Sequence, residues 1–181
     1  FATPHRLTTA RSRLAFLPER FNPPYYLSGE DFIKYVLHMQ DTGYDRTAAE
    51  LMLHAFDLDL AALSLPVRAY SKGMTQKLGL GGSFLLERDL YLLDEPMSGL
   101  DPSSRVAVKT VLARLSREGR TLFFTSHVLA DVEELCSSLA VLDRGRLRFR
   151  GSPAALCEKY SEPRLEAAFM RCIRDRAAEP A

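Results

Sequence analysis

The chain has 181 residues, of which 46% are hydrophobic and 26% are charged, a balance typical of a globular protein and unlike that of a disordered chain. Its 24 basic and 23 acidic side chains leave a formal net charge of +1, so the sequence lacks the basic excess typical of a protein that binds nucleic acid. Three widely spaced cysteines, Cys136, Cys157 and Cys172, predict neither a zinc site nor a disulfide framework.

The first predicted element is a short strand. Residues 13–19 form an apolar run that Pro18 ends, which is typical of a strand leaving the core. The aromatic and proline-rich residues 21–27 predict an ordered loop. Ser28 followed by Asp31 predicts the start of a helix, because the hydroxyl can cap backbone amides and the carboxylate favours the positive end of the helix dipole.

The segment from residue 25 to about residue 87 is predicted to be helical throughout. Its first helix has apolar residues at helical spacing, namely Phe32, Tyr35, Val36 and Met39. A second helix is predicted over 47–56, with an apolar face that includes Leu51 and Ala55. A later helix contains glycines that are expected to permit close packing at a propensity cost of about 1 kcal/mol each, namely Gly79, Gly81 and Gly82.

After residue 87 the pattern changes to strands alternating with helices, which predicts an α/β fold with a mainly parallel sheet. Strands are predicted at 89–93, 121–125, 139–143 and 146–150, and helices at 102–118, at 129–136 and from 152 onward. The strand at 121–125 is almost continuously apolar, so we expect it to be buried on both faces. Apolar residues at helical spacing between 163 and 176 predict a final amphipathic helix.

An acidic pair directly follows the strand predicted at 89–93. Asp94 and Glu95 would therefore lie at the carboxyl edge of a parallel sheet, where open α/β sheets bind ligands. Taken alone, the pair is equally compatible with a strand that ends in a solvated acidic turn. Its neighbours favour the first interpretation, because further motifs lie on both sides of it in the chain.

Five motifs resemble those of ATP-binding-cassette (ABC) ATPases in kind and in order, and they extend over nearly the whole chain. Leu17-Pro18-Glu19 resembles the Q-loop, and Ser71 to Gln76 resembles the signature loop. Asp94-Glu95 resembles the end of the Walker B strand, and Ser98 to Asp101 resembles the D-loop. Thr125-Ser126-His127 contains a match to the switch histidine.

The resemblance implies a P-loop NTPase-like (RecA-like) fold, in which a mainly parallel sheet core carries an inserted helical subdomain. The implied domains are a partial ATPase core at 1–24 and 88–160, a helical subdomain with the signature loop at 25–87, and a C-terminal helical tail at 161–181.

The resemblance also implies which residues form the hydrolytic side of the site. Asp94 would hold Mg²⁺, for which carboxylate oxygens are suitable ligands. Glu95 would polarise the attacking water, and His127 would reach the γ-phosphate, although alone this histidine fits a core position or a helix cap. Glu19 stands where the family has Gln, so its carboxylate can touch magnesium or water but offers no amide donor.

Ser71 and Gly73 open a helix, so a hydroxyl and backbone amides can meet phosphate oxygens at its positive end; Ser71 is also compatible with a simple N-cap. By resemblance, this loop with Gln76 completes the nucleotide site of the opposite subunit, and Asp101 contributes to nucleotide binding. Lys72 replaces the first signature glycine.

The resemblance implies ATP and Mg²⁺ as cofactors. It also implies a second ATP-binding subunit as a partner, in a homodimer or a heterodimer.

The phosphate-binding loop, Gly-x-x-x-x-Gly-Lys-[Ser/Thr], has no counterpart, because the sequence contains no Gly-Lys dipeptide. In the family this loop lies several tens of residues before the Q-loop, whereas only 18 residues precede Glu19 here. We expect an N-terminally truncated sequence that is inactive by itself, in line with Phe1 in the first position. The alternative is a natural partial domain that contributes only its signature loop to a partner.

The resemblance implies a subunit that couples ATP hydrolysis to transport across a membrane, with a transmembrane permease as its partner and no nucleic acid. Residues 129–151 resemble exporter-type subunits in particular, and the implied location is the cytoplasmic face of the cell membrane. Phe21, Tyr25 and Tyr26 lie where family members contact the membrane subunit. A soluble ABC ATPase acting on ribosomes or DNA is the alternative, although the sequence shows no second cassette, coiled-coil insertion or basic arm.

Overall fold

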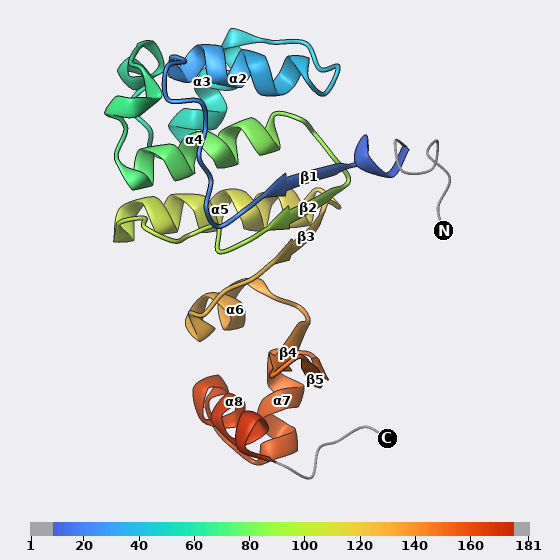
Figure 1. Ribbon diagram of the computed structural model, residues 1–181. Helices are drawn as coiled ribbons and strands as arrows, with labels where there is room; N and C mark the ends of the chain where they lie inside the picture. Colours follow the sequence, from blue (N-terminus) through green and yellow to red (C-terminus); the bar gives the residue numbers. More distant parts are fainter. Residues whose placement is uncertain (1–8, 176–181) are drawn as a thin grey trace. The chain divides into compact units, whose positions relative to one another are not determined.

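The computed structural model describes residues 9–175, so the parts of the predicted ATPase core and helical tail at 1–8 and 176–181 lie outside the described residues. The chain forms two compact units, with the boundary between Thr125 and Ser126 (Figure 1). This boundary falls inside the segment 88–160 that the motifs assigned to the ATPase core. The division into core, helical subdomain and tail stays a prediction.

The first unit is built on a three-stranded parallel sheet in the order β1-β2-β3. Its strands are Leu14–Leu17 (β1), Leu90–Leu93 (β2) and Thr121–Phe124 (β3). Its helices are Gly29–His38 (α2), Arg46–Ala55 (α3), Lys72–Phe84 (α4) and Pro102–Arg117 (α5), with the short 3₁₀ helices Leu60–Ser64 (η1) and Val67–Ala69 (η2). The predicted α/β architecture, with a helical segment inserted between the first two strands, is confirmed.

The register of the strands gives the sheet two faces of different exposure. One face carries the rows Ala15–Tyr91–Leu122 and Leu17–Leu93–Phe124, and the other carries Leu14–Leu90–Thr121 and Phe16–Leu92–Phe123. Helix α4 packs on the first face, where the ring centroids of Phe84 and Tyr91 are 4.8 Å apart. On the second face Phe16 is 61% exposed and Phe123 is 60% exposed.

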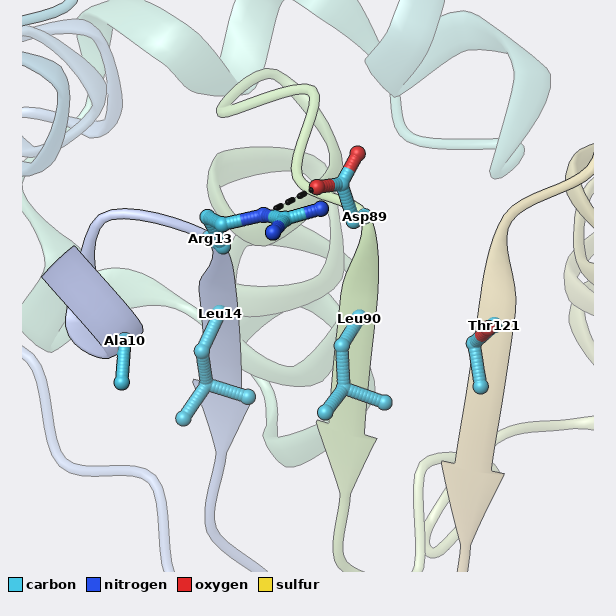
Figure 2. A pocket seen from close by; sticks show the side chains of 6 residues that line it. All are labelled: Ala10, Arg13, Leu14, Asp89, Leu90 and Thr121. Atoms are coloured by element: carbon cyan, nitrogen blue, oxygen red, sulfur yellow. Dashed lines mark hydrogen bonds and ion pairs between the residues drawn. The ribbon is translucent and has the colours of Figure 1, made fainter.

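The prediction that the strand at 121–125 is buried on both faces is therefore wrong for β3. Its side chains alternate between exposed and half-buried along the strand. An apolar run of this kind is typical of a strand in a sheet that is covered on both faces. Within residues 9–175, however, the helices of this unit cover only one face of the sheet. Figure 2 shows the first row of that face, with Leu14, Leu90 and Thr121 side by side.

Both predicted helices at the start of the helical segment form, and each buries only part of the apolar face that its spacing indicated: Phe32 is buried as expected, and Val36 and Ala55 are half-buried. The buried residues are Phe32, Ile33 and Leu37 in α2, and Ala49 and Leu53 in α3. The residues of the expected apolar faces that are instead exposed are Tyr35, Met39 and Leu51. Each helix has more apolar residues than one face can hold, and packing against the glycines of α4 selects the side on which Ile33 and Leu53 lie.

The second unit contains the helix, the hairpin and the C-terminal amphipathic helix that the sequence predicts. Its elements are Leu129–Leu135 (α6), the antiparallel strands Leu139–Asp143 (β4) and Arg146–Gly151 (β5), Pro153–Tyr160 (α7) and Leu165–Arg174 (α8). Its core consists of Val141, Leu156, Leu165, Ala168 and Cys172, so one face of α8 supplies most of the buried side chains. In the described part of the chain, every helix is too short or too polar to cross a bilayer.

Helix α4 approaches the sheet closely at Gly79. A Cβ atom at this position would lie 2.8 Å from Cδ1 of Leu17 and 2.8 Å from the ring of Phe21, closer than packed carbon atoms tolerate. Gly82, on the next turn of the same helix, differs because a Cβ there would lie 3.4 Å from Cδ1 of Ile33. Gly79 thus sets the spacing between helix and sheet, whereas Gly82 has nearly enough room for a methyl group.

Gly79→Ala is expected to lower the free energy of unfolding by about 1–3 kcal/mol, the usual cost of overpacking a core, although alanine is the better helix former. Gly82→Ala is the matched control, because the same change in the same helix gains about 1 kcal/mol of helix propensity at a small steric cost. Urea unfolding of the chain, followed by circular dichroism, measures both. Equal stabilities of the two variants would contradict the close approach at Gly79.

Candidate functional site

The carboxyl ends of β1, β2 and β3 meet at one edge of the sheet, because the strands are parallel and end in the same row of the register. Asp94 and Glu95 follow β2, Thr125 follows β3, and Glu19 lies two residues beyond β1. The N–H of Asp94 donates to the carbonyl of Leu17 at 2.8 Å, which continues the ladder beyond the strand. The structure thus brings the predicted acidic pair to the edge at which open α/β sheets bind ligands.

Thr125 joins the two acidic residues. Its hydroxyl donates to Oδ1 of Asp94 at 2.5 Å and accepts a hydrogen bond from the backbone N–H of Glu95 at 3.0 Å. Glu95 has a left-handed backbone, with φ at 48°, a conformation that costs a residue other than glycine about 1–2 kcal/mol. The motifs assigned no role to Thr125, but a hydroxyl residue at the end of the strand beside the acidic strand was a signal for one.

The segment after the acidic pair folds into a compact turn that leads into α5. The N–H of Ser98 donates to the carbonyl of Glu95 at 3.0 Å, and Gly99 has φ at 75°, in the left-handed region that glycine adopts readily. Met97 and Leu100 are buried. These two apolar side chains anchor the turn to the core, so Ser98 and Gly99 are held at the surface in a defined position.

Asp101, which was predicted to contact the nucleotide, caps helix α5. Its Oδ1 accepts a hydrogen bond from the N–H of Ser104 at 2.9 Å, and its Oδ2 accepts one from the Ser104 hydroxyl at 2.5 Å. Both hydrogen bonds lower the pKa of the Asp101 carboxyl, and the one from the Ser104 hydroxyl has the larger effect. Both oxygens therefore have structural partners, and the nucleotide contact stays a prediction.

Ser71 and Gly73 begin α4, as the signature loop predicts. Ser71 is the N-cap, and its Oγ accepts a hydrogen bond from the N–H of Met74 at 3.1 Å. Its hydroxyl proton can still be donated. Ser71 is exposed and Gly73 is half-buried, so the loop offers a hydroxyl and backbone N–H groups at the positive end of a 13-residue helix.

Two further side chains of α4 hold the turn that follows the acidic pair. Lys72 donates from Nζ to Oγ of Ser98 at 3.2 Å. Gln76 is 4% exposed, and its Nε2 donates to the carbonyl of Pro96 at 3.0 Å. The Gln76 amide nitrogen thus holds the turn from inside the protein, and the contact predicted for Gln76 with nucleotide stays a prediction.

Glu19 and His127 belong to different units. Glu19 is exposed beyond β1, at the edge that carries the acidic pair. His127 is an exposed residue of the second unit, just before α6, where the Oγ of Ser126 accepts a hydrogen bond from the N–H of Val128 at 3.1 Å. The contacts predicted for Glu19 with magnesium and for His127 with the γ-phosphate stay predictions.

Asp94 is a suitable ligand for Mg²⁺. Magnesium is usually bound through one or two carboxylates, with substrate phosphates and water completing its coordination. Within residues 9–175 no group of three or more His, Cys, Asp and Glu side chains is arranged to hold a metal ion. The carboxyl edge of the sheet therefore fits a magnesium ion that arrives with phosphate groups and does not fit a site made of protein ligands alone.

A hollow lies at the opposite end of the strands. It is lined by Ala10, Arg13, Leu14, Asp89, Leu90 and Thr121 (Figure 2), and Nε of Arg13 donates to Oδ2 of Asp89 at 2.7 Å. These residues begin or precede the strands, whereas the acidic pair follows β2. The hollow is therefore separate from the candidate site and belongs to the open face of the sheet.

Gly99→Ala is expected to destabilise the protein through two separate effects. Its φ of 75° costs alanine about 1 kcal/mol, and a Cβ there would lie 2.9, 3.0 and 3.2 Å from Cδ, Cε and Cγ of Lys72. Lys72→Ala removes the contact but leaves the backbone cost. The double variant should therefore lose less stability than the sum of the single variants in a double-mutant cycle measured by urea unfolding. Additive losses would show that Lys72 does not cover Gly99.

Comparison with known proteins connects this geometry to a family. Residues 36–129 match the family model described as "AAA domain, putative AbiEii toxin, Type IV TA system". An uncharacterised ABC transporter ATP-binding protein of Synechocystis sp. is 35% identical over 147 residues, which are 80% of this chain and 42% of that protein. The fluoroquinolones export ATP-binding protein of Mycobacterium tuberculosis is 32% identical in an alignment 164 residues long, which covers 84% of this chain and 54% of that protein.

The chain thus spans about half the length of these curated relatives. A solved structure of the ATP-binding subunit of an ABC transporter matches it with a TM-score of 0.81 and 25% identity, covering 95% of this chain and 73% of that chain. This likeness confirms the predicted P-loop NTPase-like fold. With the ordered motifs and the curated relatives, it shows that the chain belongs to the family of ABC transporter ATP-binding proteins.

Proposed function

We propose that this chain supplies the hydrolytic side of an ABC-type ATPase site, in a protein that couples ATP hydrolysis to transport across a membrane. The observation that carries the proposal is the acidic pair at the carboxyl edge of the sheet, where Thr125 forms hydrogen bonds with both Asp94 and Glu95. Phosphoryl transfer depends mainly on positioning and on charge stabilisation. A metal ligand and a base held side by side on a rigid sheet meet that requirement.

Each residue of the edge has a distinct proposed role. Asp94 would hold Mg²⁺, which when bound neutralises charge on the ATP phosphates. Glu95 would act as general base toward the attacking water, a role typically worth roughly 10²–10⁴ in rate. Glu19 would contact the ion or its water, and His127 would contact the γ-phosphate.

Ser71 and Gly73 would serve the site of a second ATP-binding subunit, in a homodimer or a heterodimer. Their position at the positive end of α4 supports binding to phosphate oxygens. A narrower second function is that the chain contributes only this loop to its partner, for which the exposed Ser71 hydroxyl at the start of α4 is placed.

The proposed membrane partner is a permease subunit, which places the protein at the cytoplasmic face of the cell membrane. Tyr25 and Tyr26 are 66% and 68% exposed, with ring centroids 5.6 Å apart, and they would offer an apolar surface to that subunit. The export function named for the Mycobacterium tuberculosis relative supports an exporter. The nearly neutral net charge of +1 favours a transporter over an ATPase acting on ribosomes or DNA.

Glu95→Gln is expected to keep MgATP binding and to lower steady-state hydrolysis by at least about 100-fold, because glutamine keeps the size of the side chain but cannot accept the proton. The assay measures nucleotide binding and phosphate release in an assembly that includes a phosphate-binding loop. Glu118→Gln, an exposed carboxylate just after α5, is the control and should hydrolyse ATP normally. Unchanged hydrolysis by Glu95→Gln would refute the role given to Glu95.

The chain of 181 residues is expected to show no measurable MgATP binding by itself in isothermal titration calorimetry, because it has no phosphate-binding loop. The same titration of an assembly that includes such a loop is the positive control. Saturable binding by the isolated chain would show that the edge around Asp94 holds the nucleotide without that loop.

A further inference from the structure

A single hydroxyl connects the two residues on which the proposed reaction depends. The N–H of Thr125 donates to the carbonyl of Leu93 at 3.0 Å, which places Thr125 one step beyond the paired part of β3. From there its hydroxyl contacts Asp94 and the N–H of Glu95. Because a backbone N–H can only donate, the hydroxyl accepts from Glu95 and gives its own proton to the carboxylate of Asp94.

The backbone of Glu95 is held on both sides of its Cα atom. Its N–H donates to Thr125 at 3.0 Å, and its carbonyl accepts from the N–H of Ser98 at 3.0 Å. Between these bonds φ is 48°, a left-handed conformation that persists in a residue other than glycine only where its surroundings hold it. Thr125 provides the side-chain part of that restraint.

We propose that Thr125 is a positioning residue, whose one hydroxyl sets both the direction of the Asp94 carboxylate and the left-handed backbone of Glu95. The proposal rests on the function proposed above for these two residues. Because Oδ1 of Asp94 accepts from Thr125, Oδ2 is the oxygen that this carboxylate can turn to a metal ion. Loss of the hydroxyl would release the metal ligand and the base together.

Two substitutions separate this role from a purely structural one. Serine keeps the hydroxyl and loses the methyl group, whereas valine keeps the shape of threonine and loses the hydroxyl. If Thr125 served only the strand, valine would be tolerated, because it is a good strand former, and serine would be the worse replacement. If the hydroxyl positions the acidic pair, the order is reversed.

Amide hydrogen exchange of Glu95, measured by NMR on the 181-residue chain, tests the geometry without nucleotide. Thr125→Val is expected to speed this exchange about 5- to 10-fold, which is the change in rate expected when one hydrogen bond is lost. Thr125→Ser is expected to keep the exchange rate within about twofold of the original. Thr121→Val is the matched control, because it makes the same change at an exposed threonine, at the start of β3. Exchange in Thr125→Val as slow as in the original chain overturns the proposal.

Turnover tests the catalytic consequence in an assembly that includes a phosphate-binding loop. Thr125→Val is expected to lower kcat about 10- to 100-fold and to leave KM for ATP within about threefold of the original, because a mispositioned group affects the chemical step more than binding. Thr125→Ser keeps the hydroxyl and is expected to retain most of the original activity. Thr121→Val should match the original. Thr125→Ala also removes the hydroxyl, and it replaces the valine variant if circular dichroism shows that valine disturbs the fold.

The two measurements distinguish failure of the inference from failure of the proposed function. Faster exchange at Glu95 with an unchanged kcat in Thr125→Val overturns the positioning role while leaving the ATPase proposal intact. If the original assembly hydrolyses no ATP, the proposed function fails, and the exchange rate still decides whether Thr125 holds Glu95.

Discussion

The common register of three parallel strands is the constraint on which the rest of the first unit depends. Because β1, β2 and β3 end in the same row, the residues that follow them meet at one edge although they are far apart in the chain. The hydrogen bond between Thr125 and Asp94 spans 31 positions of sequence. A slip of one residue in β3 would turn its side chains to the opposite face and would break the contact that links the acidic pair.

Helix α4 connects the helical segment to that edge. Gly79 allows the helix to lie close to Leu17 of β1, and this approach brings the first turns of α4 to the turn after the acidic pair. Lys72 reaches Ser98 there, and buried Gln76 holds the carbonyl of Pro96. One rigid helix thus carries the signature loop at its start and braces the segment beside the proposed base, so the two regions are mechanically linked within the unit.

Local features were predicted well from the sequence. The N-caps Ser28 and Ser71 act within one turn of their own helices, and Pro18 ends β1 as its fixed backbone geometry requires. Burial was predicted less well. Leu51 lies on the exposed side of α3, and Phe123 is exposed on β3, because an apolar pattern shows that a side chain is suited to burial and does not show which neighbour covers it.

By itself the sequence determined the order of strands and helices, the helix caps, the residues that follow each strand, and the family to which the motifs belong. Only the tertiary structure decided that Gln76 points inward, that both oxygens of Asp101 serve a helix cap, and that Thr125 joins Asp94 to Glu95. The physical reason is the range of the forces involved. Caps and periodicity act within a few residues, whereas these side-chain roles depend on strand register and helix packing, which bring distant residues together.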